Sequence, residues 1–376
     1  MSGVDGNKKV PAIRFEGFSG EWEIKKIENL ISDETIYPPQ DGNHGEIHPK
    51  AKDYVDFGIP FIMANSVRNG SIDLYGCSHI TIEQAENLQK GFAKKNDVLL
   101  THKGTVGEVA IVYENEFPFI MLTPQVTYYR ILDNKLDNQF LASSFSTKKF
   151  QHSLKEAAGG GTRAYIGITQ QQELSISISP QKKEQTKIGN YFQQLDTLIA
   201  QHQQKHDKLQ NLKKALLEKC FPKQGEHTPE LRFKGFSGAW EEKALGDVAN
   251  FNPKAELPQS FEYVDLESVS GTELISYRTE NKRSAPSRAQ RLATKGDVFY
   301  QTVRPYQKNN YLFNRKESNF VFSTGYAQMR PYGNSYFLLS LVQTENFVRI
   351  VLDNCTGTSY PAINSNDLAK IDKHFP

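Results

Sequence analysis

A basic, tyrosine-containing segment between Arg278 and Lys316 is the part of the sequence whose residue types most directly indicate a chemistry. It carries ten lysines and arginines against two acidic residues, whereas the whole chain of 376 residues has a net charge of only +2. Cationic side chains mixed with aromatic and amide groups suit phosphate anchoring and contacts with base edges. The segment therefore predicts a nucleic-acid contact, with a solvated charged surface as the alternative. The DNA-binding residues predicted here are Arg278, Lys282, Arg283, Arg288, Arg291, Arg304 and Lys308.

Three glycine-containing loops add further candidates. One, at residues 102–107, joins two predicted strands, and it lacks the GxxxxGK[ST] spacing of a nucleotide phosphate-binding loop. A second loop lies at 159–163, and a third lies near the C-terminal end at 357–363. Such loops are either plain connectors or flexible nucleic-acid contacts. The DNA contacts predicted from them are Lys103, Thr105, Arg163, Thr358 and Tyr360.

Signatures of catalysis are weak. The sequence has no [DN]PP[YF] methyltransferase motif, no Walker lysine and no GxSxG motif. Asp265, Glu280 and Lys282 resemble the acidic residues and lysine of a nuclease site, but such triads arise often by chance. The HGEIH segment at residues 44–48 lacks the HExxH order, and no third metal ligand is apparent. We therefore predict a non-catalytic protein without a metal site.

A long helix is predicted to organise the chain. Residues 181–220 contain no proline, and their only glycine is Gly189. Apolar residues recur in steps of three or four, as on one face of a helix, and His202 and His206 keep the same register between Ile199 and Leu209. At 1.5 Å per residue the segment would form a rod of roughly 60 Å. The apolar seam, predicted to be a subunit interface, consists of Ile188, Phe192, Leu195, Ile199, Leu209, Leu212 and Leu216.

The segments that flank this helix are copies of each other. Pro11–Ile24 recurs as Pro229–Glu242 with 9 of 14 positions identical, which indicates an internal repeat. Three weaker matches follow in the same order. They are Tyr54–Asp56 with Tyr263–Asp265, Asn96–Thr101 with Gly296–Gln301, and Gly161–Ile166 with Gly357–Ile363. The sequence therefore predicts two related domains joined by the helix.

Composition and local patterns predict an α/β fold with twisted β-sheets in each domain. Short β-branched and aromatic runs predict strands, and one stretch in the first half predicts a helix at 138–158. The strands are expected at 59–63, 98–101, 109–113, 119–122 and 126–131. The expected division is a leader at 1–10, a first domain at 11–180, a spacer helix at 181–222 and a second domain at 223–376. With no 18-residue apolar run, no signal peptide and three scattered cysteines, a cytoplasmic protein without a membrane span is expected.

The arrangement of these motifs resembles the specificity subunit of type I restriction-modification systems. Each domain opens with RF-x-GF-SG-x-W and closes with a GT-containing loop, and the first leads into P-x-x-x-EQ-x-K-I and a long helix. The residues of that last motif are Pro180, Glu184, Gln185, Lys187 and Ile188. The resemblance implies two target recognition domains for the halves of a bipartite DNA sequence. It also implies that the helix acts as a spacer and as a docking surface for modification subunits.

The same resemblance implies that the chemistry belongs to partner subunits. Two modification subunits would transfer methyl groups from S-adenosylmethionine to double-stranded DNA, and a restriction subunit would use ATP and Mg²⁺. No cofactor is expected on this chain. The family's second long helix, which follows the second domain, is absent from this sequence. Base-contacting residues vary between family members, so the DNA contacts predicted here depend on loop position and charge. A coiled-coil adaptor that binds proteins is the alternative, favoured by the weak global charge.

Overall fold

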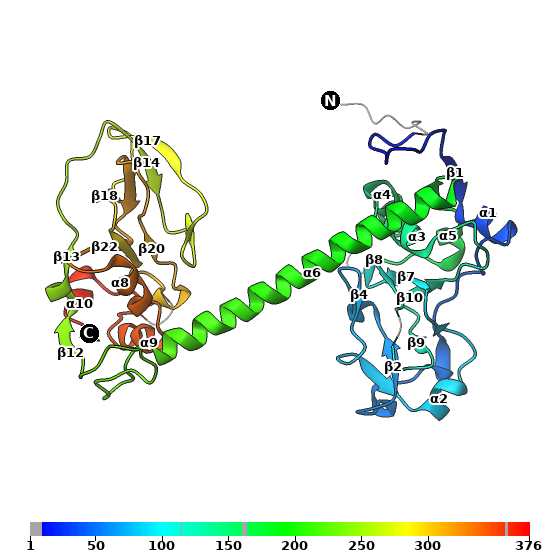
Figure 1. The fold of residues 1–376 in the computed structure, drawn as a ribbon, viewed down its shortest axis with the longest axis horizontal. Coiled ribbons are helices and arrows are strands. Elements are labelled where there is room, and N and C mark those ends of the chain that lie inside the picture. The colour runs from blue at the N-terminus through cyan, green and yellow to red at the C-terminus, as the bar shows by residue number, and fades with distance from the viewer. Residues whose placement is uncertain (1–9, 114, 160–163, 358–359) are drawn as a thin grey trace. The chain divides into compact units, whose positions relative to one another are not determined.

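The computed structural model describes residues 10–113, 115–159, 164–357 and 360–376. The chain divides into two compact units, Met1–Gln203 and Gln204–Pro376, and the division falls inside the long helix α6 (Lys182–Lys219) (Figure 1). The predicted helix at 181–220 is confirmed to within one residue at each end. Its one glycine is required by packing, because a Cβ at Gly189 would lie 2.6 Å from Cβ of Gln139 and 2.8 Å from the amide nitrogen of Phe140.

The first unit contains a mixed four-stranded sheet, ordered β5-β2-β9-β6, and an antiparallel three-stranded sheet, ordered β10-β7-β8. Two-stranded pairs β1-β11 and β3-β4 complete it. Its strands are β1 (Glu23–Lys26), β2 (Ile59–Ile62), β3 (Val67–Arg68), β4 (Ser71–Ile72), β5 (Ser78–Ile80), β6 (Phe92–Ala93), β7 (Val98–Lys103), β8 (Thr105–Ile111), β9 (Ile120–Leu122), β10 (Val126–Tyr129) and β11 (Ser175–Ile178). Its short helices are α1 (Ile27–Ser32), α2 (Ile82–Glu86), α3 (Asn138–Phe145), α4 (Lys148–Ala157) and α5 (Ile168–Gln172).

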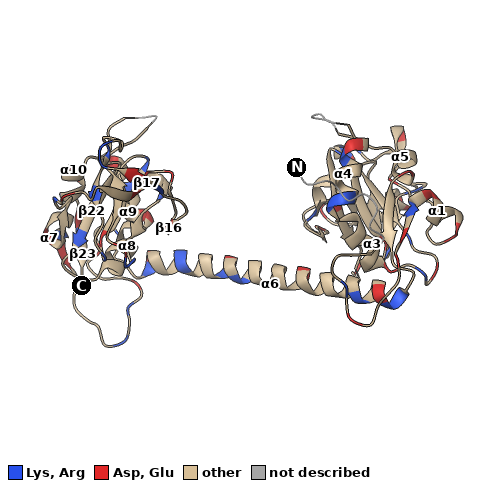
Figure 2. Cartoon of the chain, turned by 90° about the horizontal axis from the view of Figure 1, so that it is seen from above, with Lys and Arg blue, Asp and Glu red and all other residues tan. Residues whose placement is uncertain are grey.

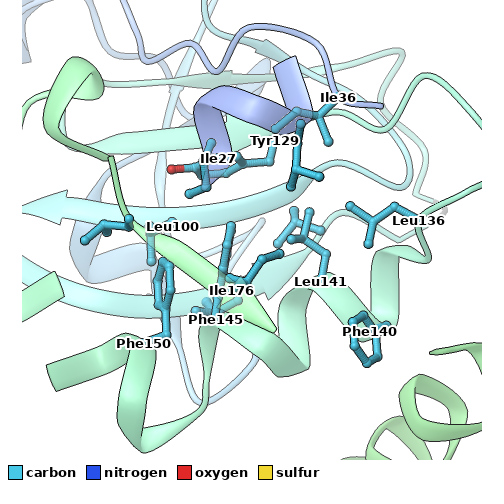
Figure 3. Close-up of a cluster of buried hydrophobic side chains, with 14 of the residues drawn as sticks. Ile27, Ile36, Leu100, Tyr129, Leu136, Phe140, Leu141, Phe145, Phe150 and Ile176 are labelled. Carbon is cyan, nitrogen blue, oxygen red and sulfur yellow. The ribbon is translucent and has the colours of Figure 1, made fainter. Parts of the chain in front are cut away.

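The strand β7 is apolar at consecutive positions because both of its faces are covered. Val98 and Leu100 belong to a core cluster with Tyr129, Phe140 and Phe145 from strand β10 and helix α3 (Figure 3). The intervening Leu99 belongs to a different cluster. Successive side chains of a strand point to opposite faces, so one short run serves two cores.

The helix predicted at 138–158 is in fact two helices, α3 and α4. The break falls at Ser146 and Thr147, where the side chain of Thr147 accepts a hydrogen bond from the backbone N–H of Phe150 at 3.3 Å. A threonine in this position satisfies an otherwise unpaired helical N–H and starts a new helix. The apolar pattern continues across the break, because both helices pack on the same core.

The second unit repeats this plan. Its four-stranded sheets are ordered β17-β14-β21-β18 and β13-β22-β19-β20, with pairs β12-β23 and β15-β16 beside them. The strands are β12 (Glu241–Ala244), β13 (Ala249–Phe251), β14 (Ser260–Val264), β15 (Val269–Ser270), β16 (Glu273–Leu274), β17 (Arg278–Asn281), β18 (Ala289–Leu292), β19 (Val298–Gln301), β20 (Tyr311–Leu312), β21 (Phe320–Ser323), β22 (Tyr326–Pro331) and β23 (Asp372–Phe375). The helices are α7 (Leu245–Val248), α8 (Ser335–Val342), α9 (Glu345–Asp353) and α10 (Ser365–Ala369).

A buried ion pair occurs at the same place in both units. The Arg130 guanidinium donates to the two carboxylate oxygens of Asp97 at 2.9 and 2.6 Å. Arg330 donates to Asp297 in the same way at 2.8 and 2.9 Å. Asp297 lies as many positions after Asp97 as Arg330 lies after Arg130. The structure therefore supports the predicted match of Asn96–Thr101 with Gly296–Gln301.

The predicted match of Tyr54–Asp56 with Tyr263–Asp265 is wrong. Strand β14 runs parallel to β21 with Tyr263 opposite Val321, and β2 runs parallel to β9 with Phe61 opposite Met121. Tyr263 therefore corresponds to Phe61, and Asp265 follows the strand as Met63 does in the first unit. Three identical letters are too few to fix a register that sheet pairing decides.

Within the described residues, no helix is long and apolar enough to cross a membrane.

Candidate nucleic-acid interface

A strand end and a distant loop are joined by two backbone hydrogen bonds in the first unit. The N–H of Gly104 donates to the carbonyl of Ala164 at 3.3 Å, and the N–H of Ile166 donates to the carbonyl of His102 at 3.1 Å. Residues 102–105 and 164–166 thus form one surface, here termed the first junction. The first junction brings together the end of β7 and the segment after residue 163, which the sequence indicated only as two separate loops.

The second unit contains the equivalent surface. The N–H of Arg304 donates to the carbonyl of Pro361 at 2.8 Å, and the N–H of Ile363 donates to the carbonyl of Thr302 at 3.0 Å. Residues 302–304 and 360–363 are termed the second junction. The pairing supports the predicted correspondence of the two GT-containing loops.

Each junction places a cation over an exposed tyrosine. The Lys103 ammonium lies 5.9 Å from the centre of the Tyr165 ring, and the Arg304 guanidinium lies 4.6 Å from the centre of the Tyr360 ring. The two rings are 47% and 64% exposed. Exposed rings beside cations suit stacking and phosphate contacts with nucleic acid. Tyr165 was missed by sequence reasoning, although it lies in the repeated GTRAYI segment.

The backbone of Arg304 is in the left-handed region, with φ of 55°. The residue at the same place in the first junction is Gly104, with φ of 82°. A non-glycine residue pays roughly 1 kcal/mol or more for this conformation, and such residues concentrate at functional sites. An arginine at a position that favours glycine supports a role for its side chain.

A recess of about 230 Å³ adjoins the first junction. It is lined by Lys103 together with His44, Gly45, His48, Met63, Thr123, Pro124 and Gln125. The side-chain carbonyl of Gln125 accepts from the backbone N–H of Ala64 at 3.0 Å, which fixes the amide in place. The Nδ1 atom of His48 is buried and has no hydrogen-bond partner among the described residues. The recess is therefore lined by a cation, an amide and an imidazole with one unpaired nitrogen.

Within the first junction, the side chain of His102 is buried. Its Nδ1 atom shares a hydrogen bond of 2.8 Å with the Thr127 hydroxyl, while its Nε2 atom is 3.9 Å from the carboxylate of Asp41. Burial lowers the pKa of His102 to about 4, although the charge of Asp41 acts in the opposite direction. The ring is therefore neutral near pH 7. Asp41 instead binds Lys90 at 2.5 Å and His44 at 2.8 Å.

The nuclease-like residues are held in an ion-pair network. Arg278, a predicted DNA contact, donates to Asp265 at 2.7 Å and to Glu280 at 2.9 Å. Lys282 lies 3.7 Å from Glu256. Both carboxylates thus share one arginine as their ion-pair partner. Across the part of the chain that the structure describes, no group of three His, Cys, Asp or Glu side chains is arranged to hold a metal ion.

The remaining basic residues of the segment are distributed over two sheets. Arg283 and Arg288, in the connection between β17 and β18, are exposed and have no side-chain partner among the described residues. Arg291 in β18 is partly buried, which lowers its pKa. Lys308 is bound to Glu345 at 2.7 Å. In Figure 2 the cations of this unit lie on several elements with acidic residues among them. Of the predicted residues, Arg283, Arg288 and Arg304 stay candidates for DNA contacts because no carboxylate binds them among the described residues.

Three further predicted contacts are located as follows. Thr105 is exposed at the start of β8, opposite Lys103 in the strand register. Arg163 and Thr358 lie outside the described residues.

The seam of α6 is largely uncovered. Ile188 packs against the core of the first unit. The other six side chains are between 36% and 66% exposed: Phe192, Leu195, Ile199, Leu209, Leu212 and Leu216. Exposed apolar side chains at helical spacing are unusual on the surface of a monomeric protein.

Comparison with known proteins agrees with this architecture. A family model described as "Type I restriction modification DNA specificity domain" matches residues 20–211, just over half of the chain. The HindI specificity subunit of Haemophilus influenzae is 22% identical over 147 residues, which are 36% of this chain and 32% of that protein. The match thus spans about a third of the relative's length.

A solved structure shares the fold. The S subunit of the type I restriction-modification system from M. genitalium superimposes with a TM-score of 0.58 at 16% identity, over 98% of this chain and 87% of that one. The predicted α/β class, with two related domains joined by a long helix, is confirmed. The chain belongs to the family of type I restriction-modification DNA specificity domains.

Proposed function

We propose that this chain is the DNA-recognition subunit of a type I restriction-modification complex and that each unit recognises one half of a bipartite target. The observation that carries the proposal is the repeated junction. The same two backbone hydrogen bonds occur in both units, but the residues presented are Lys103 with Tyr165 in one and Arg304 with Tyr360 in the other. A constant scaffold with different side chains is what recognition of two different half-sites requires.

The chemistry of the junctions suits the major groove. Lysine and arginine donate hydrogen bonds, and guanine presents two acceptors, N7 and O6, on its major-groove edge. Arg304 is able to donate two parallel hydrogen bonds, whereas Lys103 acts as a point charge. Gln125 adds an amide beside Lys103. Arg283 and Arg288 would contact phosphates and contribute affinity without sequence preference.

The recognition domains proposed are residues 11–180 and 223–376, with 181–222 as the spacer. Two modification subunits would cover the exposed seam of α6, and a restriction subunit would join the complex. Methyl transfer from S-adenosylmethionine and ATP-dependent cleavage with Mg²⁺ would take place on those partners. This chain would bind none of these cofactors and catalyse no step, and incubation with plasmid and Mg²⁺ is expected to leave the DNA intact.

The experiment is methylome sequencing of a host that carries this chain with its modification subunits. The native chain should give one split, asymmetric motif. Lys103→Ala should relax positions in one half only, and Arg304→Ala should relax positions in the other half only. Lys308→Ala is the matched control, because that ammonium is already bound to Glu345. A motif that is unsplit, or one in which either substitution alters both halves, would refute independent recognition.

A further inference from the structure

Gln125 adjoins the first junction and is held at both its backbone and its side chain. Its carbonyl accepts a hydrogen bond from the N–H of His102 at 2.9 Å, at the end of β7. Its side-chain Oε1 accepts from the N–H of Ala64 at 3.0 Å, on the segment that follows β2. Two segments that are distant in the sequence therefore hold this side chain in one orientation.

The hydrogen bond from Ala64 determines which end of the amide is free. A backbone N–H group only donates, so the atom that receives it must be the amide oxygen of Gln125. Nε2 has no hydrogen-bond partner among the described residues, and Gln125 lines the recess of about 230 Å³ beside the first junction. The side chain therefore offers its N–H groups to the recess, while its oxygen is already engaged.

A second donor lines the same recess. The Lys103 ammonium has no hydrogen-bond or ion-pair partner in the part of the chain that the structure describes. Other polar side chains of the lining are occupied: Thr123 donates its hydroxyl hydrogen to a backbone carbonyl at 3.0 Å, and His44 is bound to a buried carboxylate at 2.8 Å. The ammonium of Lys103 and the amide of Gln125 are thus the donors available to a ligand.

The second unit has glycine at the place of Gln125. Strands β7 and β10 pair in the same register as β19 and β22, so position 125 corresponds to position 325. The carbonyl of Gly325 accepts from the N–H of Thr302 at 3.0 Å, in the place of the bond from His102 to Gln125. The backbone hydrogen bond is the same in both units, and only the side chain differs.

The space beside this position is open in the first unit and filled in the second. Ala64 corresponds to Leu266, because each is the second residue after the aligned strands β2 and β14. A Cβ atom at Gly325 would lie 2.9 Å from Cγ and Cδ1 of Leu266. That distance is too short for two carbon atoms in contact, so Leu266 excludes a side chain there unless it moves. Alanine accompanies glutamine in one unit, and leucine accompanies glycine in the other.

The junction residues change in the opposite sense. Gly104 of the first unit corresponds to Arg304 of the second, whereas Gln125 corresponds to Gly325. Donors for a base edge are therefore supplied by two side chains, Lys103 and Gln125, in the first unit and by a single guanidinium in the second. The glycines at 104 and 325 leave room for the side chain that is used in each case.

We propose that Gln125 is a specificity-determining residue for the first half of the target, where its Nε2 and the Lys103 ammonium donate to the two major-groove acceptors of one guanine. Guanine presents N7 and O6 there, whereas cytosine presents a donor. Glutamine recognises adenine through both ends of its amide, and here Oε1 is already bound to Ala64. This inference rests on the function proposed above and adds the base that the first unit recognises.

The test substitution is Gln125→Glu. Glutamate keeps the shape and an oxygen for the N–H of Ala64, but it presents an acceptor to the recess where glutamine presents a donor. In methylome sequencing of a host that carries the variant with its modification subunits, the preference for guanine at one position of the first half should fall about tenfold or more, and cytosine should gain. The second half should be unchanged, which shows that the complex assembles. Gln139→Glu, in α3 of the same unit, is the matched control for the added charge and should leave the motif unaltered.

A second readout uses the native complex and does not depend on the folding of a variant. Duplexes that carry the motif are prepared with 7-deazaguanine, which lacks the N7 acceptor, at one guanine of the first half at a time. One of these replacements should weaken binding about tenfold. A first half without guanine, or binding that is insensitive to every replacement, would overturn the proposal.

Retention of the native first half by the Gln125→Glu complex would also overturn it. If the motif is split and Lys103→Ala relaxes its first half, these outcomes refute the role of Gln125 alone. An unsplit motif would instead refute the function on which the inference rests.

Discussion

Asp97→Asn tests whether the buried ion pair of the first unit stabilises that unit alone. The Asp97 carboxylate is 2% exposed and accepts three hydrogen bonds, two from Arg130 and one from the backbone N–H of Lys94 at 2.8 Å. Asparagine has nearly the same shape. Because its amide is neutral, Arg130 would lose its only anionic partner among the described residues. In one of its two orientations the amide would also place an N–H group against the guanidinium.

The expected loss follows from burial. Removing one partner of a buried pair costs about 3–5 kcal/mol. The Arg130 side chain is 30% exposed, so water compensates in part and the lower end, about 3 kcal/mol, is expected. With a urea dependence of about 2 kcal/mol per molar, the unfolding midpoint of the first unit should fall by about 1.5 M.

The assay exploits the position of the two tryptophans, one in each unit. In a Trp240→Phe background, fluorescence follows the first unit through Trp22. In a Trp22→Phe background, it follows the second unit through Trp240. Asp97→Asn should move only the first transition, and Asp297→Asn should move only the second. Equal movement of both transitions would refute independent stability of the units, and a midpoint change below about 0.3 M would refute the assigned energy.

Three other predictions follow from the same contacts. Burial alone would raise the pKa of Glu184, but hydrogen bonds, above all from Arg14, hold that pKa below its usual value. The stability that this shift contributes is fully present above the pKa of glutamate in the unfolded chain, about 4.3. It is lost as the pH falls through the lower pKa of Glu184 in the folded protein. Glu184→Gln should therefore flatten acid unfolding of the first unit, measured by the fluorescence of its tryptophan, and an unchanged acid profile would contradict this. Arg283→Gln should weaken binding to all DNA sequences alike and reduce the slope of log affinity against log salt by about one, whereas an unchanged slope would place the phosphate contacts elsewhere. Burying one isoleucine contributes roughly 1.5–3 kcal/mol, so the chain without partners should self-associate through the exposed seam of α6. Ile199→Asn should reduce this association, and co-expression with a modification subunit should rescue solubility. A monodisperse native monomer in light scattering at micromolar concentration would refute the role of the seam.

Sequence reasoning succeeded where the signal was local. Helix α6 was predicted nearly to the residue, because apolar spacing and the absence of proline act within a few turns. Strands β7, β9 and β10 were predicted to within a few residues, whereas β8 begins at Thr105, inside the loop predicted at 102–107 and four residues before the predicted start of the strand. The helix at 138–158 failed only at its break, where the capping by Thr147 was overlooked although threonine is a common N-cap residue.

Contacts between distant segments were not predictable in the same way. Arg278 was a plausible phosphate ligand until the structure placed it between Asp265 and Glu280. Tyr165 was overlooked because nothing in the sequence indicates that its loop meets the end of β7. The match of Tyr54 with Tyr263 failed because strand pairing, rather than letter identity, sets the correspondence.

The sequence by itself determined the repeat, the connecting helix and the family resemblance, because each depends on residues that are near one another or copied in order. Only the tertiary structure decided which cations are free, which are neutralised by a carboxylate, and which loops share a surface. The physical reason is that charge pairing and backbone hydrogen bonding depend on distance in space. The repeated segments Pro11–Ile24 and Pro229–Glu242 make the distinction plain: they share 9 of 14 residues, yet Trp22 has an acidic partner and Trp240 has none among the described residues.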